Sequence, residues 1–265
     1  MIRTYNKIIP IFLLLLVFGA CDQVDEPYGN QVEIDEPDEL TKKAVIFEFT
    51  GIHCTNCPQG HAAIKTIDSV YHGHVIPIAV HAGYFATPYG DDPDFRTPFG
   101  DALYADLEEP FTPAAVVGSM DKDNVVVGAP ATWQSEVGNV IPSYTKIIVT
   151  PEHQYSDSVV EVTYKLQEQS EIGSSLLFYA FIIENNIEGP QSGTEISPYI
   201  HQHVLRKCIS NLSGNSVNFT DGTASVSFSA SVEPGWNVDN LKLVGIIVDA
   251  VTKEIYTGEM VKILE

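Results

Sequence analysis

Apolar and polar positions follow two different periods along this chain, and the change falls near residue 145. Between residues 41 and 145, continuous apolar runs alternate with segments in which apolar residues recur every three or four positions. The runs are typical of strands that helices cover on both faces, and the segments are typical of amphipathic helices. The pattern predicts strands at 44–50, 74–80, 114–117 and 124–127, and helices at 57–70, 98–107 and 131–144.

After residue 145 the helical spacing largely disappears, and short strand candidates follow one another. Polar and apolar residues alternate most clearly at 224–229, and turn signals such as Asp221-Gly222 and Pro234-Gly235 separate the strands. This spacing is typical of an antiparallel sandwich of immunoglobulin-like type. It predicts strands at 146–150, 158–165, 175–183, 216–219, 223–232 and 241–248, with a last pair at 254–256 and 260–263.

The predicted fold class is therefore α/β plus all-β, with an α/β domain at 41–145 and a β-sandwich domain at 146–265. Removing the chain after about Tyr144 should then leave a foldable α/β domain, because the periodicity changes there. Pairing of strands from Lys146 onward into the central sheet of the first domain would contradict this boundary.

The first twenty residues are typical of a secretory signal. Arg3 and Lys7 make a basic start, residues 8–18 are apolar apart from one proline, and Gly19-Ala20 precede Cys21. This arrangement resembles the lipobox of bacterial lipoproteins, which implies cleavage before Cys21 and acylation of that residue. An ordinary cleaved signal, with Cys21 as a plain residue, is the alternative.

Residues 21–40 are acidic and contain Pro27 and Pro37, so we expect a flexible linker that buries too little to fold. It is either a soluble stalk or a signal for export to the cell surface. The whole chain has 35 acidic and 14 basic residues, a formal net charge of −21, which argues against nucleic acid as a partner. Anionic lipid is repelled as well, so attachment to a membrane requires the acyl chains at Cys21.

The strongest chemical signal is Cys54-Thr55-Asn56-Cys57-Pro58, which lies between a predicted strand and a predicted helix. A strand, a short turn with two cysteines and a helix form the active-site layout of a thioredoxin-like fold. The N–H groups and the dipole of the helix N-terminus favour a thiolate. We expect Cys54 to be the nucleophile and Cys57 to be the more buried, resolving cysteine. A protonated His53 would favour the Cys54 thiolate; a solvent-facing loop histidine is the alternative.

A second signal of the same kind is Thr112-Pro113, directly before a predicted strand. In thioredoxin-like proteins a cis-proline at this place abuts the disulfide and exposes the preceding backbone for pairing with a substrate. We therefore expect a cis bond, and a substrate groove formed by Thr112, Pro113 and His53. A trans proline that begins a strand is the alternative.

Other residues are candidates for a metal or for a reactive thiol. On a strand, His201 and His203 would share one face and could chelate a metal, although a surface position or packing between domains explains them more simply. Cys208 is an odd thiol, interpreted as buried and inert. No second Cys-x-x-Cys or His-x₃-His pair is present, so we expect neither a metal nor a cofactor. The zinc or copper alternative near the cysteine pair would use Cys54, Cys57, His53 and His61.

Taken together, these motifs resemble the family called "outer membrane protein of 28 kilodaltons". The resemblance rests on the lipoprotein signal, Phe-Thr-Gly-Ile-His-Cys-Thr-Asn-Cys-Pro at 49–58, Thr-Pro-Ala-Ala-Val-Val at 112–117 and His-Gln-His-Val-Leu-Arg at 201–206. It implies an outer-membrane lipoprotein with a thioredoxin-like half, and it leaves open which face of the membrane the protein lies on. It implies no settled activity.

These residues are compatible with two functions. In the first, a lipid-anchored thiol–disulfide oxidoreductase uses Cys54 and Cys57 on protein thiols or disulfides. In the second, a surface binding or adhesion lipoprotein uses the pair as a structural disulfide. Exposure of Cys54 discriminates between them, because a catalytic pair exposes one sulfur, whereas a structural disulfide is normally buried.

Overall fold

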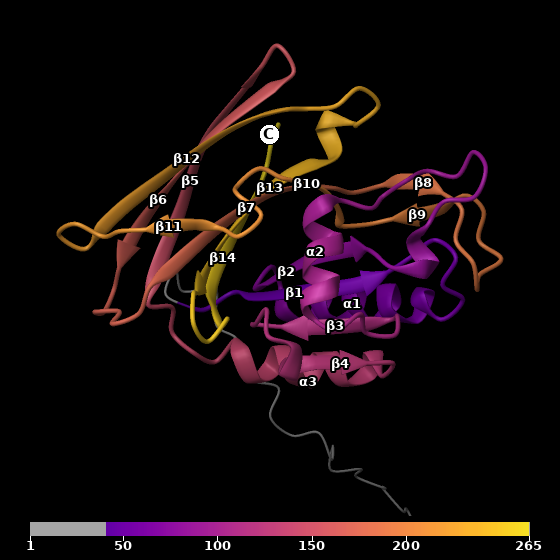
Figure 1. Cartoon of the computed structure of the whole chain (residues 1–265), viewed down its shortest axis with the longest axis horizontal. Helices are drawn as coiled ribbons and strands as arrows, with labels where there is room; N and C mark the ends of the chain where they lie inside the picture. Colours follow the sequence, from indigo (N-terminus) through magenta and orange to yellow (C-terminus); the bar gives the residue numbers. More distant parts are fainter. Residues whose placement is uncertain (1–40, 265) are drawn as a thin grey trace, which may run out of the picture. The chain divides into compact units, whose positions relative to one another are not determined.

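The structure, a computed structural model, describes residues 41–264 (Figure 1). The predicted signal, the acidic linker and Cys21 lie outside these residues. None of the described helices is long and apolar enough to cross a membrane. The helices are α1 (Cys57–Tyr71), α2 (Pro98–Asp106) and α3 (Pro130–Val140). The strands are β1 (Ala44–Thr50), β2 (Val75–His81), β3 (Ala114–Val117), β4 (Val125–Val127), β5 (Ile147–Ser156), β6 (Val159–Glu168), β7 (Leu176–Glu184), β8 (Ile187–Gly189), β9 (Tyr199–His201), β10 (Val204–Cys208), β11 (Asn215–Val217), β12 (Thr223–Ser231), β13 (Leu241–Asp249) and β14 (Ile255–Lys262).

One large sheet contains strands from both halves of the chain. Its order is β14-β13-β7-β10-β2-β1-β3-β4, with β11 paired to β7. The strands β1 and β2 run parallel and are joined through α1, as expected for a crossover connection, whereas β3 and β4 are antiparallel additions. In Figure 1 the indigo strands β1 and β2 and the orange strands β7 and β10 therefore belong to the same sheet.

The boundary predicted at residue 145 does not separate two sheets. Val204 of β10 pairs in parallel with Ala79 of β2, and the Ala79 amide donates to the His203 carbonyl at 2.8 Å. Edge pairing of this kind leaves no periodic signal in either strand, because it depends only on where the two backbones meet. The described residues 41–264 accordingly lie in one compact unit, and independent folding of residues 41–145 is tested by the truncation described in the Discussion.

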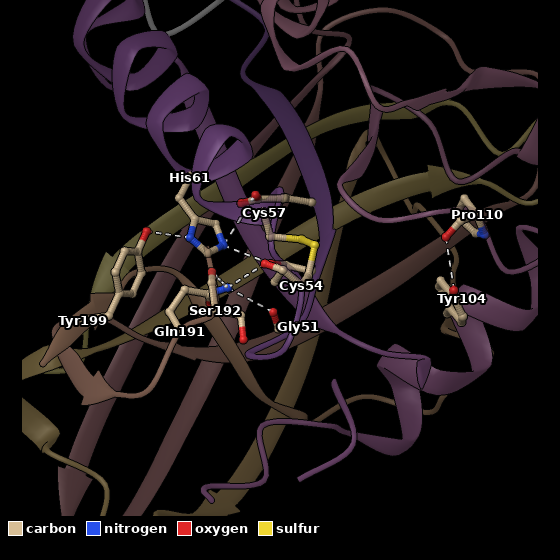
Figure 2. The surroundings of a disulfide bond; sticks show 11 residues. Gly51, Cys54, Cys57, His61, Tyr104, Pro110, Gln191, Ser192 and Tyr199 are labelled. Atoms are coloured by element: carbon tan, nitrogen blue, oxygen red, sulfur yellow. Dashed lines mark hydrogen bonds and ion pairs between the residues drawn. A yellow bond between two sulfur atoms is a disulfide. The ribbon is translucent and has the colours of Figure 1, made fainter. Parts of the chain in front are cut away.

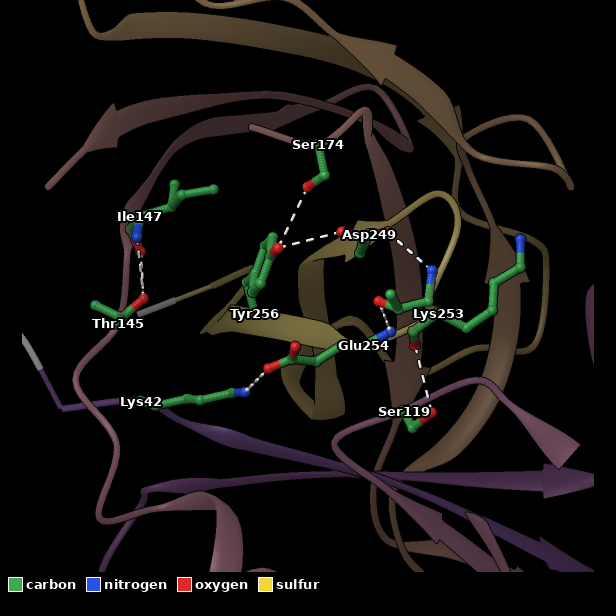
Figure 3. A network of polar contacts seen from close by, with 10 residues as sticks. Lys42, Ser119, Thr145, Ile147, Ser174, Asp249, Lys253, Glu254 and Tyr256 are labelled. Atoms are coloured by element: carbon green, nitrogen blue, oxygen red, sulfur yellow. Dashed lines mark hydrogen bonds and ion pairs between the residues drawn. The ribbon is translucent and has the colours of Figure 1, made fainter. Parts of the chain in front are cut away.

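A second joint ties Lys42 and the residues after β3 to the turn between β13 and β14 (Figure 3). Lys42 donates to Glu254 at 3.0 Å, and the Ser119 hydroxyl donates to the Lys253 carbonyl at 3.4 Å. The Ile255 amide also donates to the Gly118 carbonyl at 2.9 Å. Backbone hydrogen bonds therefore join the two halves at this turn as well as between β10 and β2.

The core lies on both faces of the large sheet. On one face Phe47 of β1 meets Phe99 of α2 and Phe181 of β7, with ring centroids 6.4 and 6.1 Å away. On the other face of β7, Phe178 packs against Tyr164 of a three-stranded sheet with order β12-β6-β5, at 4.8 Å. Alternate residues of one strand thus serve two cores. The three-stranded sheet therefore packs on the large sheet, which also contains β1 and β2.

The predicted elements of the first half match the observed ones closely, and the second half needs two corrections. The pair predicted at 254–256 and 260–263 is the single strand β14, which passes through Gly258 where a Cβ would approach the Gly245 carbonyl of β13. The strands β8, β9 and β10 were not predicted, because they have three to five residues and no regular alternation.

Candidate functional site

The cysteine pair closes a turn at the start of α1. The Cys54 amide donates to the Gly51 carbonyl at 3.0 Å, and the Cys57 amide donates to the Cys54 carbonyl at 3.3 Å. Cys57 is the first residue of α1 and is followed by Pro58, which is favoured there because the first helical N–H groups have no partner. The two cysteines form a disulfide with a Cα–Cα distance of 5.4 Å.

Both cysteines are covered. Cys54 is 2% exposed and Cys57 is 0% exposed. Cys57 is the more buried of the two, in the predicted order, but the difference is small. The expectation that a catalytic pair exposes one sulfur is not met in this oxidised state, and this observation favours the structural-disulfide alternative.

The cover comes partly from a strap between β8 and β9, which consists of Pro190, Gln191, Ser192 and Gly193. The Gln191 amide nitrogen lies 3.2 Å from the Gly51 carbonyl and 3.0 Å from the Cys54 carbonyl (Figure 2). The Ser192 amide donates to the Ile52 carbonyl at 2.8 Å. Gly193 has a φ of +81°, and a Cβ there would overlap the backbone of Thr55. Residues of the second half therefore hold the cysteine turn by donating hydrogen bonds to the carbonyl oxygens of the turn.

A long insertion after β2, residues 83–110, holds the other side of the turn. The His53 amide donates to the Phe85 carbonyl at 3.0 Å. The His53 ring lies 4.3 Å from the Tyr89 ring, and its Nε2 lies 3.2 Å from a carboxylate oxygen of Asp92. His53 therefore contacts the insertion, and its predicted influence on Cys54 stays a prediction.

The proline signal is confirmed at the level of geometry. The Thr112–Pro113 bond is cis, and Pro113 is buried directly before β3. A Cβ built on Gly60 of α1 would lie 3.3 Å from Pro113, so the proline packs against the first turns of the cysteine helix. The Thr112 hydroxyl is buried without a hydrogen-bond partner among the described residues. Their role in binding a substrate stays a prediction.

Sequence reasoning missed Glu48, a carboxyl group beneath the cysteine helix. It lies in the middle of β1, is 3% exposed, and its Oε1 would be 2.5 Å from a Cβ on Gly60. Burial raises the pKa of Glu48 to about 8, so the carboxyl is mostly protonated at neutral pH. The available signal was the single charged residue inside the apolar run 44–50.

A group of histidines also lies beside the turn, and His201 and His203 do not have the arrangement that the metal-chelating alternative requires. His201 ends β9 and is 2% exposed, whereas His203 has a φ of +57° in the turn before β10, so they share no strand face. His201 instead lies near His81 and His61, with ring centroids 5.7 and 6.4 Å away. Burial lowers the pKa of all four rings, so they are neutral at pH 7.

In residues 41–264 no three His, Cys, Asp or Glu side chains are arranged to hold a metal ion. The zinc or copper alternative also loses its thiolates, because Cys54 and Cys57 are joined to each other. Cys208 ends β10, partly exposed, with its sulfur 3.3 Å from the Ser210 hydroxyl. Burial raises the pKa of Cys208, which fits the predicted unreactive thiol.

Comparison with known proteins places the chain among envelope proteins. The family described as outer membrane protein Omp28 matches residues 110–263. No curated protein sequence matches the chain. The structure is similar to HBP35 of Porphyromonas gingivalis, with a TM-score of 0.70, 21% identity, and coverage of 84% of this chain and 76% of that one.

Two further solved structures are similar to this chain. A protein of Agrobacterium tumefaciens has a TM-score of 0.57 and 13% identity, with coverage of 84% of this chain and 96% of that one. A domain of the outer membrane lipoprotein Omp28 from Porphyromonas gingivalis is 21% identical over 45% of this chain and 88% of that domain, with a TM-score of 0.35. At these identities, the likenesses to HBP35 and to the Agrobacterium protein concern the fold alone: a mixed α/β fold with extensive β-sheet.

Proposed function

The chain belongs to the Omp28 family of outer membrane proteins, and we propose that its Cys54–Cys57 pair exchanges disulfides with protein clients in that envelope. We interpret residues 41–145 as a thioredoxin-like part and Cys21 as the acylated attachment to the membrane. The strand, cysteine turn and helix, followed by the cis-proline before β3, support the first interpretation. The sequence around Cys21 supports the second.

The proposed exchange conserves atoms and electrons within the two pairs of sulfurs. The Cys54 thiolate attacks a client disulfide, so a Cys54–client bond forms and the other client sulfur leaves as a thiolate. Glu48 first releases its own proton to solvent. Cys57 then gives its proton to the resulting carboxylate and attacks the Cys54 sulfur, which releases the client reduced by two electrons. In the reverse direction a client thiolate attacks Cys54, and the departing Cys57 thiolate takes the proton from Glu48.

The observation that carries this proposal is the buried Glu48. Holding a carboxyl protonated at neutral pH costs roughly 3 kcal/mol of folding free energy when its pKa moves from 4.5 to about 8. A disulfide that only staples the chain has no use for an ionisable group beneath it. A leaving thiolate does, because it needs a proton donor with a pKa close to that of a free thiol, about 8.5.

Trapping tests the proposal. In a Cys208→Ser background, Cys57→Ser should accumulate mixed disulfides with client proteins, because the resolving thiol is missing. Cys54→Ser should accumulate none and is the matched control. The adducts are measured on non-reducing gels of membrane fractions and should disappear with reductant.

The second candidate function is a binding or adhesion protein with a structural disulfide, and the burial of both cysteines favours it. In that case neither variant would yield adducts, and the wild-type pair would stay oxidised under mild reductant. These two results together would exclude the exchange function.

Attachment to the membrane has its own test. Cys21→Ala should move the protein from the membrane fraction to the soluble fraction or block its processing, because acylation requires that thiol. Cys208→Ser is the control and should leave both unchanged. A Cys21→Ala protein that is processed normally and stays in the membrane would contradict lipid anchoring.

A further inference from the structure

A row of polar side chains leads from the buried Glu48 carboxyl to the partly exposed Tyr199. Glu48 Oε1 lies 3.7 Å from His61 Nε2, and the same nitrogen lies 2.9 Å from the Thr50 hydroxyl. On the other edge of the ring, His61 Nδ1 lies 2.7 Å from the Tyr199 hydroxyl (Figure 2). The row joins β1 and α1 of the first half to β9 of the second half, directly beside the disulfide.

We propose that His61 and Tyr199 carry protons between Glu48 and solvent, a role that rests on the proposed disulfide exchange. When Glu48 gives its proton to the departing Cys57 thiolate, the carboxylate takes the Nε2 proton of His61. The Nδ1 atom of His61 takes the Tyr199 hydroxyl proton, and a water molecule restores the phenol. Oxidation of the pair sends one proton back along the same atoms, so a full cycle restores the tautomer of His61.

Glu48 has few other partners that could serve this purpose. Its Oε1 atom is buried and has no hydrogen-bond partner among the described residues. The nearest basic atom in an ion-pair geometry is His61 Nε2, and His61 is the side chain that also reaches Tyr199. A purely structural histidine would be satisfied by Thr50 and Tyr199 and would not need to face a protonated carboxyl.

The protonation states of the row suit transfer at neutral pH. Burial, together with His201 and His203, lowers the pKa of His61 to about 4, so one ring nitrogen accepts while the other donates. Burial and the nearby Glu48 raise the pKa of Tyr199 to about 12, so the phenol keeps its proton between transfers. Below about pH 4 a doubly protonated His61 could no longer accept a proton from Tyr199.

Other titratable and charged groups surround the row from each element that packs against it. His81 of β2 lies behind His201, and the rings of Tyr199 and His201 are 5.0 Å apart. Arg206 of β10 lies over the Phe95 ring and pairs with Glu184 at 3.2 Å. The set whose titration must be considered beside His61 is Glu48, His81, Tyr199, His201, His203 and Arg206.

The test compares wild type with Tyr199→Phe, which keeps the ring and removes the hydroxyl. Tyr144→Phe is the matched control, because Tyr144 is exposed and its hydroxyl is not part of the row. The rate at which oxidised glutathione oxidises the purified reduced protein is measured from pH 6 to 9.5 at a fixed glutathione concentration. Tyr199→Phe should slow oxidation by about tenfold below pH 8, because Glu48 must lose its proton along the row before it can accept the Cys57 proton. The loss should vanish above about pH 9, where Glu48 is already ionised.

Two further measurements separate proton transfer from a structural effect and from failure of the proposed function. The reduction potential of the pair should be unchanged in Tyr199→Phe, whereas loosened packing would shift it. His61→Gln should show the same pH-dependent loss of rate, and added imidazole should restore the rate. This variant replaces Tyr199→Phe in the test if Tyr199→Phe does not fold. Wild type and both variants with parallel pH profiles would overturn the proton path. The trapping experiment is independent: absence of client adducts would overturn the exchange function even where the pH profiles differ.

Discussion

A chain that ends at Thr145 is expected not to fold. The truncation removes β7, β10 and β13 from the large sheet and takes away the partner of the Ala79 amide of β2, the His203 carbonyl. It also removes Phe181, whose ring packs 6.1 Å from Phe47 and 4.8 Å from Phe99. Since a domain is stable by only about 5–15 kcal/mol, loss of one side of the core should abolish the cooperative transition.

Thermal unfolding followed by circular dichroism measures this result, with residues 41–265 as the control. The control keeps every described strand and should unfold in one cooperative transition. A truncated protein with a sharp transition and dispersed NMR signals would show that residues 41–145 are an independent domain after all, as the periodicity alone predicts.

Glu48→Gln is expected to stabilise the protein, and to do so only above pH 5. The folded state holds the Glu48 proton up to about pH 8, whereas the unfolded state loses it near 4.5. Between these values the unfolded state binds fewer protons, so the stability of wild type falls as pH rises. Gln removes that loss, and the gain in the free energy of unfolding should be about 3 kcal/mol at pH 7 and below 1 kcal/mol at pH 5.

Urea unfolding of the oxidised protein at pH 5, 7 and 8.5 checks this prediction. Glu136→Gln, on an exposed position of α3, is the matched control and should change stability by less than about 0.5 kcal/mol at each pH. The buried histidines titrate in wild type and variant alike, so the difference between the two isolates Glu48. A gain from Glu48→Gln that is equal at all three values would contradict the raised pKa. In the exchange assay the same variant should lose activity, because the proton donor is gone.

The elements of the first half and the cysteine motif at its turn can be predicted from the sequence alone. The strand at 44–50 and the helix that begins at Cys57 follow from local periodicity, and Pro58 marks the helix start. The cis geometry of Pro113 followed from a motif resemblance. The charged Glu48 in an apolar run was visible as well, but its meaning required knowing that α1 lies over it. These features depend on residues close in sequence, where a side chain's period or type is sufficient.

The segments that complete the sheet and the site cannot be identified before the chain is folded. The pairing of β10 with β2 involves backbone groups that any sequence supplies, so no side-chain pattern announces it. Gln191 reaches the Cys54 carbonyl from 137 positions away, and Tyr199 reaches His61 from 138 positions away. A polar residue in an irregular segment carries no signal of its partner until the fold brings the two together. The covered disulfide and the row from Glu48 to Tyr199 are for this reason properties of the folded chain.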